Sequence, residues 1–550
     1  MKKLSFVDKG FLMSETREMP MHVGGVSLYT LPPGADEQEF LHSLAANMRD
    51  AETMLPPFGD RLKTGRLGLA GNAYWEPDPA LDLDYHVRHS ALPAPGRYRE
   101  LFTLVSRLHG TLLERSRPLW EMHLIEGLPD RQFAVYTKTH HAAVDGARSV
   151  HVSRAMLSAD PKHVLQESPL SLGLWEKYKA GLKMGKRPEY STSELRSVSD
   201  MLKLSLGSGA NIFQAVKGFA ETWAGRGDGL ALPHMQVPHS VLNTPIDGAR
   251  RFVAQSWPFA RIKAVAKAYD GTFNDAVLGM CAGALRKYLQ IHAELPEQSL
   301  KAMVPVSLRQ AGDVDSGNAV AAISADLATH IADPAQRVAA IKRSVQAGKD
   351  FYAGMTPKEI ELFFMIMQSP SALLLPLGLI SKLPPYNVAI SNVPGIRQTM
   401  YWNGARMNGS YPLSIVTDGM AMNITLVTYD QNVDFGIIAC RRSLPQVQRM
   451  IDYMEEALQE LEDAAGLTAK PAKKRPAVTA GSRSKVKPKT KSRPKAKAKA
   501  KAKAKAKAKA KDRTRPRAKP KAKPAPKTAA KRKASPGAKS KKSAKARPKS

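Results

Sequence analysis

The sequence predicts a mixed α/β protein made of two structured regions and a basic tail. Helix and strand patterns alternate from residue 1 to about 160 and again from 246 to 466, whereas residues 161–245 lose this regularity. From residue 467 to 550 the composition changes to Lys, Ala and Pro without any aromatic residue. We therefore expect an N-terminal domain (1–160), a partly helical connection (161–245), a C-terminal domain (246–466) and a disordered tail (467–550).

The N-terminal region contains a predicted helix followed by a predicted β-hairpin. Apolar residues recur at helical spacing from 99 to 116, and Pro118 is expected to end this helix. An alternating run at 120–125, a turn at 127–130 and a second alternating run at 133–139 then predict two antiparallel strands.

The C-terminal region has its clearest helix start at Thr272-Phe-Asn274-Asp275, where Thr272 or Asn274 can cap the first turn. Apolar residues then follow at helical spacing. Later strands are predicted around 386–391, 422–427 and 433–439.

The formal charge of +34 lies in the tail. The chain has 83 Lys and Arg against 49 Asp and Glu, and residues 470–550 hold 35 of the basic residues and one of the acidic ones. The other 48 basic and 48 acidic residues balance, which indicates an ordinary globular body. The tail is expected to bind an anionic membrane or lipid-droplet surface, to bind nucleic acid non-specifically, or to keep the protein soluble.

Several kinds of protein are excluded by composition. Two cysteines, Cys281 and Cys440, cannot build a disulfide framework or a multi-cysteine zinc site, and they fit a reducing compartment. Asp8 and Lys9 precede any apolar core of signal-peptide length. The most apolar stretch, 360–380, is interrupted by prolines, so a buried helix broken at a proline or a surface apolar patch is expected there. We expect a cytoplasmic protein at the periphery of the inner membrane or of lipid inclusions.

The segment that can carry chemistry is His140-His141-Ala-Ala-Val-Asp145-Gly146. It follows a predicted strand and precedes a predicted helix, where loops present reactive groups at the end of a sheet. An imidazole can accept a proton near neutral pH, which makes His141 a candidate general base. Asp145 can orient neighbouring groups or cap the next helix, and Gly146 permits unusual backbone geometry.

Other interpretations of the histidine pair stay open from the residues alone. The pair could bind a metal, although no third ligand cluster has metal-ligand spacing, or it could be purely structural. The sequence has neither a G-x-S-x-G nucleophile motif nor a phosphate-binding P-loop. A base without a neighbouring nucleophile favours direct transfer between two bound substrates.

The motif at 140–146 resembles that of the CoA-dependent acyltransferase superfamily. Further motifs make the chain similar to the bacterial wax ester synthase/acyl-CoA:diacylglycerol acyltransferase family over residues 4 to 460. These motifs are Leu4-Ser-Phe-Val-Asp8, Pro20-Met-His-Val-Gly-Gly25, Pro118-Leu119-Trp120, Asn274-Asp275, Val304-Pro-Val-Ser-Leu-Arg309, Gly317-Asn318 and Ser391-Asn392-Val-Pro-Gly395. The histidine motif alone is shared with peptide-synthetase condensation domains, whereas the ordered set is specific. The basic tail departs from the family pattern.

This resemblance implies two chloramphenicol-acetyltransferase-like domains, each a mixed β-sheet with flanking helices, and a solvent channel between them. It implies acyl-CoA as co-substrate, no cofactor and no metal, and diacylglycerol or a long-chain fatty alcohol as acceptor. His141 would be the general base and His140 a supporting residue, while Asp145 and Gly146 would shape the loop. The Pro118, Leu119, Trp120, Asn274 and Asp275 motif residues would be mainly architectural, and Asn274 and Asn392 are candidate oxyanion donors.

The expected function is therefore O-acyl transfer that makes triacylglycerol, wax ester or both, without a covalent enzyme intermediate. The alternative is an acyltransferase-like protein with altered catalysis that acts through its basic tail on DNA or lipid granules. Intact His141, Asp145 and Gly146 argue against that alternative.

Overall fold

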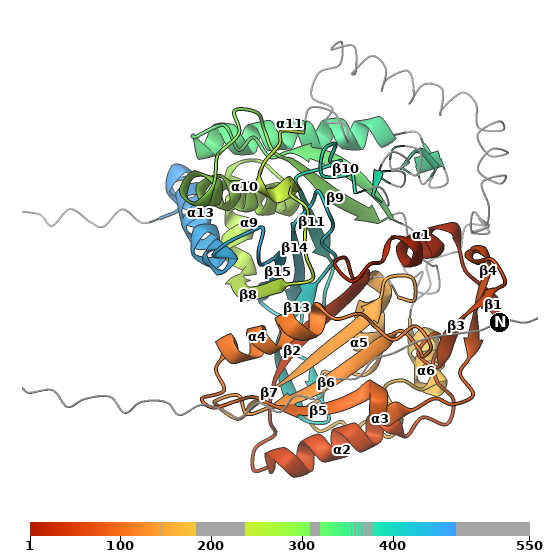
Figure 1. The fold of residues 1–550 in the computed structure, drawn as a ribbon. Helices are drawn as coiled ribbons and strands as arrows, with labels where there is room; N and C mark the ends of the chain where they lie inside the picture. Colours follow the sequence, from red (N-terminus) through yellow and green to blue (C-terminus); the bar gives the residue numbers. More distant parts are fainter. Residues whose placement is uncertain are drawn as a thin grey trace, which may run out of the picture. The chain divides into compact units, whose positions relative to one another are not determined.

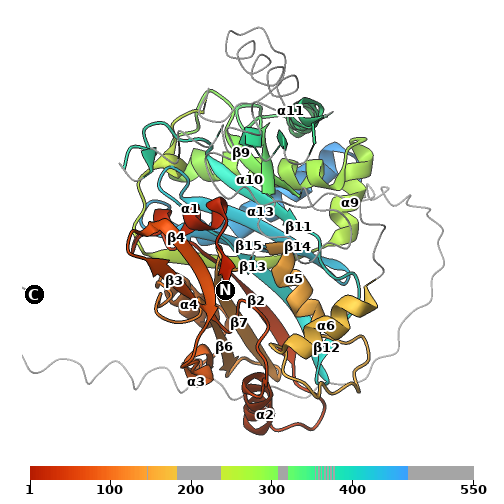
Figure 2. The ribbon, with the colours of Figure 1, turned by 90° about the vertical axis from the view of Figure 1, so that its right-hand side faces the viewer.

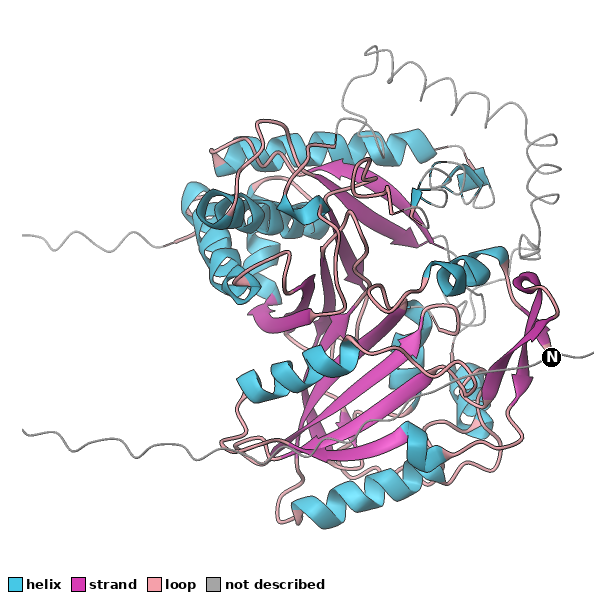
Figure 3. Cartoon of the chain, viewed as in Figure 1, coloured by secondary structure: helices cyan, strands magenta, loops and turns pink. Residues whose placement is uncertain are grey.

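The computed structural model describes residues 1–468, apart from 145, 183–236, 308–319 and scattered positions between 354 and 377. The predictions for Asp145, for the middle of the connection, for the break near Pro370 and for the tail beyond residue 468 lie outside the described residues. The described residues form two large β-sheets, a small sheet and flanking helices, as Figures 1 and 3 show, and this confirms the predicted mixed α/β class.

The first large sheet carries the histidine motif at the end of a central strand. All neighbouring strands in it are antiparallel except β5 and β6, which are parallel. In order across the sheet the strands are β12 (Tyr401–Trp402), β13 (Ala405–Leu413), β2 (His22–Thr30), β7 (Gln132–His140), β6 (Trp120–Glu126) and β5 (Val87–Ala91).

Helices cover both faces of this sheet. Apolar residues of α2 (Glu37–Arg49) and α6 (Leu172–Gly181) share one core with the strands, and those of α4 (Tyr98–His109) pack on the other side. Trp175 of α6 belongs to that first core, so this part of the predicted connection packs with the N-terminal strands. The short helix α3 (Leu83–His86) precedes β5, and α5 (Gly146–Ala155) follows the motif.

The second large sheet belongs to the C-terminal half. Its strand β11 pairs in parallel with β9 and β14, and the other pairs are antiparallel. Apolar residues of α9 (Phe259–Ala268), α10 (Phe273–His292), α11 (Pro334–Tyr352) and α13 (Met450–Ala464) share a core with it. The strand order is β10 (Val320–Asp326), β9 (Lys301–Ser307), β11 (Val388–Val393), β14 (Met422–Tyr429), β15 (Asn432–Cys440) and β8 (Arg250–Pro258).

The C-terminal half contributes two strands to the N-terminal sheet. Residues 401–413, assigned by sequence to the C-terminal domain, add β12 and β13 to the N-terminal sheet, where β13 pairs along β2. The backbone approaches closely at this junction, because a Cβ on Gly436 would lie 1.8 Å from the Pro412 carbonyl oxygen. Glycine at 436 therefore permits β15 to pack directly against β13.

The structure corrects one predicted helix and confirms the hairpin that follows it. The helix predicted over 99–116 ends at His109, because Gly110 is its C-cap and residues 111–117 turn away to meet other segments. Pro118 therefore does not end it. Strands β6 and β7 form the predicted hairpin, with Asp130 and Arg131 in left-handed conformation at the turn.

A small sheet and the first helix were not predicted from the sequence. Strands β1 (Lys2–Lys3), β4 (Gly68–Pro77) and β3 (Asp60–Gly65) lie beside α1 (Phe6–Ser14) in both views of the ribbon (Figures 1 and 2). Their shared core contains Leu4, Leu12, Ala73, Trp75, Leu113, Leu119 and Ala142. Among the helices of the described part of the chain, none is long and apolar enough to cross a membrane.

Candidate active site

The histidine pair lies where β7 leaves the sheet. The His140 backbone N–H donates to the Leu119 carbonyl at 2.9 Å, and the His141 N–H donates to the Met21 carbonyl at 2.9 Å. Neighbouring segments on both sides of β7 therefore fix the point at which the strand becomes a loop. The predicted placement of the pair at a strand end is confirmed.

His140 is built into the turn. Its side chain is fully buried, and its Nδ1 accepts a hydrogen bond from the Ala142 N–H at 3.1 Å. Since an accepting Nδ1 carries no proton, the ring proton belongs on Nε2, which lies 3.4 Å from Oε1 of Glu15. The backbone N–H groups of Ala143 and Val144 also bond the His140 carbonyl. His140 therefore shapes the loop from both its backbone and its ring.

His141 has a different environment. Its side chain is half-buried, and its ring stacks on Phe11 of α1 with centroids 4.3 Å apart and planes 16° apart. One face of the imidazole is therefore covered by an aromatic ring that also belongs to the small-sheet region. Gly146 begins α5 directly after the loop, as the strand–loop–helix pattern predicts.

A buried carboxylate, Glu15, ties the loop to α1. It accepts hydrogen bonds from the Met21 N–H at 3.1 Å and from Arg115 Nη2 at 2.9 Å, and its side chain is 2% exposed. Burial raises the pKa of Glu15, but interactions with His140, the Met21 N–H and Arg115 outweigh it and hold the pKa below its usual value. Sequence reasoning missed Glu15 and Arg115, because no spacing links residues so far apart.

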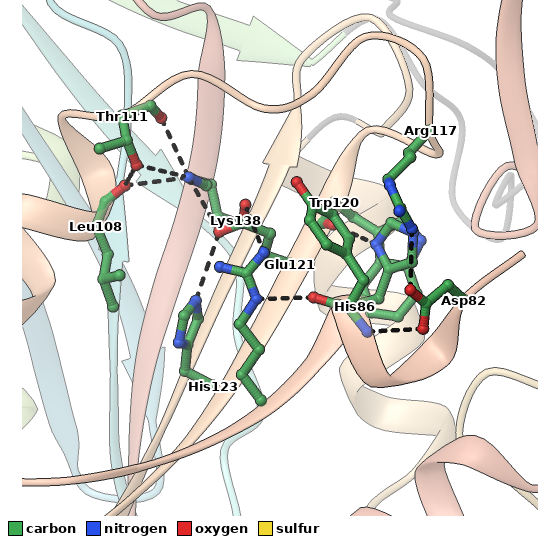
Figure 4. A network of polar contacts seen from close by, with 11 residues as sticks. Asp82, His86, Leu108, Thr111, Arg117, Trp120, Glu121, His123 and Lys138 are labelled. Atoms are coloured by element: carbon green, nitrogen blue, oxygen red, sulfur yellow. Dashed lines mark hydrogen bonds and ion pairs between the residues drawn. The ribbon is translucent and has the colours of Figure 1, made fainter.

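A second buried network supports β7 two residues before the pair (Figure 4). Lys138 Nζ donates to the carbonyls of Leu108 and Thr111, each at 3.1 Å, and lies 3.2 Å from Oε2 of Glu121. Burial raises the pKa of Glu121, but His123, Lys138 and Arg88 outweigh it and hold the pKa at about 2. The charged carboxylate therefore joins β6 to β7, and Lys138 joins β7 to the end of α4.

The Pro118-Leu119-Trp120 motif lies beside the histidine pair. The Leu119 carbonyl accepts the His140 N–H, and its side chain shares a core with Ala142. The Trp120 indole N–H donates to the Phe58 carbonyl at 2.8 Å, and its ring stacks on His86. These are packing contacts, and they give the motif a supporting position next to the loop.

The asparagine motifs belong to the C-terminal half. The Thr272 hydroxyl oxygen accepts the Asp275 N–H at 3.2 Å, and the Asp275 carboxylate accepts the Thr272 N–H at 2.7 Å, so Thr272, and not Asn274, caps α10. Asn274 and Asn392 are half-buried, on α10 and β11 respectively. In the described part of the chain, no hydrogen bond or ring contact joins them to the histidine pair.

Metal binding finds no support in the described ranges, where no three His, Cys, Asp or Glu side chains group as metal ligands. Cys281 and Cys440 are buried free thiols. The motif histidines instead contact protein groups, namely Glu15, Ala142 and Phe11.

The two-sheet fold is shared with solved condensation domains. The first condensation domain of the calcium-dependent antibiotic synthetase matches 84% of this chain and 97% of its own length, with a TM-score of 0.51 and 14% sequence identity. Identity that low shows a shared fold only. The family is identified by sequence. The family model "Wax ester synthase/diacylglycerol acyltransferase catalytic domain" matches residues 4–277, and the model of the C-terminal domain of that family matches residues 316–462.

Individual relatives agree with the family models. A Mycobacterium tuberculosis protein, provisionally named a diacylglycerol O-acyltransferase, is 43% identical over 84% of this chain and all of its own length. The O-acyltransferase WSD of Acinetobacter baylyi is 38% identical over 84% of this chain and 97% of its own length. The solved wax ester synthase/diacylglycerol acyltransferase of Marinobacter aquaeolei VT8 covers 85% of this chain and 100% of its own length, at 39% identity and a TM-score of 0.66.

The chain therefore belongs to the wax ester synthase/diacylglycerol acyltransferase family. The predicted family and the predicted enzyme class, an acyl-CoA-dependent O-acyltransferase, are confirmed. The family models end at residue 462, so the basic tail lies beyond the region they describe.

Proposed function

We propose that this enzyme moves a long-chain acyl group from acyl-CoA to the hydroxyl of diacylglycerol, of a fatty alcohol, or of both, with His141 as general base. The names of its relatives support this substrate class. The geometry of the histidine pair supports the choice of base.

One contrast carries this choice. His140 is fully buried and its Nδ1 already accepts the Ala142 N–H, so that ring nitrogen is committed to the turn. His141 is half-buried, one residue further from the sheet, with a ring held flat against Phe11. Of the two rings, His141 is therefore the one that can meet a substrate hydroxyl.

In the proposed reaction, His141 removes the hydroxyl proton of the acceptor as its oxygen attacks the thioester carbonyl carbon. A C–O bond forms and the carbonyl becomes a tetrahedral oxyanion. Collapse of this intermediate breaks the C–S bond, and the CoA thiolate takes the proton back from the imidazolium. The products are an ester and free CoA, and no enzyme atom is acylated. General-base help of this kind contributes about 10²- to 10⁴-fold.

The test is release of free thiol from palmitoyl-CoA with hexadecanol, with dioleoylglycerol or without an acceptor. We expect acceptor-dependent release that falls about 10²- to 10⁴-fold in His141→Ala. His42→Ala is a matched control, since His42 is an exposed histidine on α2. If His141→Ala still released thiol at the wild-type rate, His141 would not be the general base. If the wild-type enzyme released no thiol with either acceptor, the proposed substrate class would be wrong.

The basic tail supports a peripheral location for this activity. Each basic residue near an anionic membrane contributes up to about 1 kcal/mol, and residues 470–550 contain 35 of them. We propose that the tail holds the enzyme at an anionic lipid surface. Non-specific binding to nucleic acid would draw on the same charge.

A further inference from the structure

Two neighbouring segments beside the active-site loop expose large apolar side chains. Met13 on α1 is 60% exposed, and Leu67 in the turn between β3 and β4 is 76% exposed. α1 and the β3–β4 hairpin lie side by side in both ribbon views (Figures 1 and 2). Exposed apolar side chains of this size need an explanation when they gather on adjacent elements.

Side-chain contacts join α1 and the β3–β4 hairpin into one surface. Lys9 Nζ of α1 donates to the Gly71 carbonyl of β4 at 2.7 Å. A Cβ on Gly71 would lie 3.1 Å from the Cβ of Leu67, so the Leu67 side chain starts directly over Gly71. Met13 is four residues after Lys9 and therefore lies one helical turn along the same side of α1.

This surface carries a net positive charge, although the basic and acidic residues outside the tail are equal in number. Residues 1–14 and 60–77 together contain six basic residues and three acidic residues. Glu76 forms ion pairs with Arg61 and Lys63 at 3.1 and 2.7 Å. Arg66, next to Leu67 in the turn between β3 and β4, is exposed. Apolar side chains flanked by Lys and Arg complement a surface of anionic headgroups over acyl chains.

The other side of α1 faces the candidate active site. Phe11 stacks on His141, and Leu12 shares a core with Ala142 of the loop. An α-helix with its side chains is about 10–12 Å across, so one helix separates this surface from the loop. An acceptor lipid leaving a bilayer here would have a short path to His141.

We propose that Met13, Arg66 and Leu67 form a docking face that rests on an anionic lipid surface and brings the lipid acceptor to His141. This inference rests on the proposed function for its acceptor. The docking face would place a lipid contact on the folded part of the protein, in addition to any binding by the basic tail.

The experiment is co-sedimentation of the full chain with phosphatidylcholine vesicles containing phosphatidylglycerol. Measurements at low salt and at about 1 M salt, where the Debye length falls to about 3 Å, suppress the long-range attraction of the tail. The test variant is Met13→Asp with Leu67→Asp. Val164→Asp with Ile291→Asp is the matched control, because these residues are 54% and 55% exposed and the charge change is the same.

At high salt we expect the docking-face variant to bind vesicles about 100-fold more weakly, and the control less than about 3-fold. Met13→Ser with Leu67→Ser should weaken binding by about 10-fold without added charge, and circular dichroism should show a native fold. With dioleoylglycerol in vesicles, the docking-face variant should raise the KM, while turnover of dissolved 1-hexanol stays unchanged.

Equal losses in the two Asp variants, or no loss in either, would overturn the docking face. A KM change that is as large for 1-hexanol would also overturn it, since a dissolved acceptor does not need the surface. If the wild-type chain released no thiol with any acceptor, the proposed function would fail, while the vesicle binding would still decide the docking face.

Discussion

Each large sheet pairs a lysine with a carboxylate directly across neighbouring strands, and the two pairs differ in how much water reaches them. Lys138 and Glu121 join β7 to β6 with side chains 0% and 6% exposed. Lys301 and Asp326 join β9 to β10 with side chains 5% and 33% exposed. The N-terminal pair must therefore satisfy its charges inside the protein, whereas the C-terminal pair can share them with solvent.

Other buried polar groups show the same contrast. Among the described residues, the buried histidines His22, His86, His109, His123 and His140 all lie in the N-terminal half. The C-terminal half instead buries the amides Asn243, Asn387 and Asn423, which bond backbone carbonyls or each other. Buried histidines thus gather around the sheet that carries the motif.

The largest expected effect is on the buried N-terminal pair. Lys138→Met leaves Glu121 with much less compensation and removes the donor to Leu108 and Thr111. We expect the free energy of unfolding to fall by about 3–5 kcal/mol. Lys301→Met should cost only about 1 kcal/mol, because water reaches Asp326. Urea unfolding of both variants measures this, and equal losses would contradict the contrast between the sheets.

The next effect concerns Asp434, a fully buried carboxylate of the C-terminal sheet. Burial raises the pKa of Asp434 to about 7, against hydrogen bonds from Ser256 and the Ser410 N–H. The folded state then holds a proton that the unfolded state releases near pH 4, so this group lowers stability progressively as the pH rises from about 4 to 7.

Asp434→Asn removes that dependence, because an amide can donate to Ser256 and accept from Ser410 without a charge. Relative to wild type, we expect the variant to gain about 2–4 kcal/mol of unfolding free energy at pH 8 and almost nothing at pH 4. Chemical unfolding at the two pH values measures the difference. A gain that is the same at both would show that the Asp434 charge is not the cause.

Glu15 tests whether the buried network of the N-terminal half also positions the loop. Glu15→Gln weakens the contacts to Arg115 and His140 that orient the segment before His141. We expect kcat to fall about 10- to 100-fold with little change in KM for palmitoyl-CoA. Glu455→Gln is the control in the other half, where that carboxylate binds Trp257 and Arg261. Similar losses in kcat from both variants would argue against a positioning role.

The smallest expected effect on either sheet comes from removing residues 470–550. The last described helix, α13, ends at Ala464, ahead of the deleted residues, so the melting temperature and the turnover of dissolved acceptors should stay within error of the full chain. Low-salt binding to anionic vesicles or DNA should drop steeply. Undiminished low-salt binding by the shortened chain would show that the tail is not the anchor.

Local patterns in the sequence predicted those features that depend on neighbouring residues, namely strands, turns and helix caps. The alternation over 120–125 and 133–139 and the turn between them identified the hairpin, and the histidine pair was placed correctly at its end. Thr272 and Asp275 signalled the start of α10 through their three-residue spacing. The family motifs identified the enzyme class.

Contacts between distant residues could not be found in this way. The helix predicted to reach residue 116 ends at His109, because Leu108 and Thr111 turn toward Lys138. Glu15 meets Arg115 across one hundred positions of sequence. Neither the end of α4 nor the Glu15–Arg115 ion pair leaves a periodic pattern in the sequence, because both depend on how separate segments pack.

The place of β13 in the N-terminal sheet has a consequence for synthesis of the chain. β2 (His22–Thr30) leaves the ribosome early, but its partner β13 (Ala405–Leu413) is among the last structured segments to emerge. Until β13 is made, the β2 edge of the N-terminal sheet has unpaired backbone N–H and C=O groups, which can pair with a strand of another chain. Fragments that stop before residue 405 should therefore aggregate or require a chaperone, and the nascent chain should reach its protease-resistant form only after the last strands have been translated.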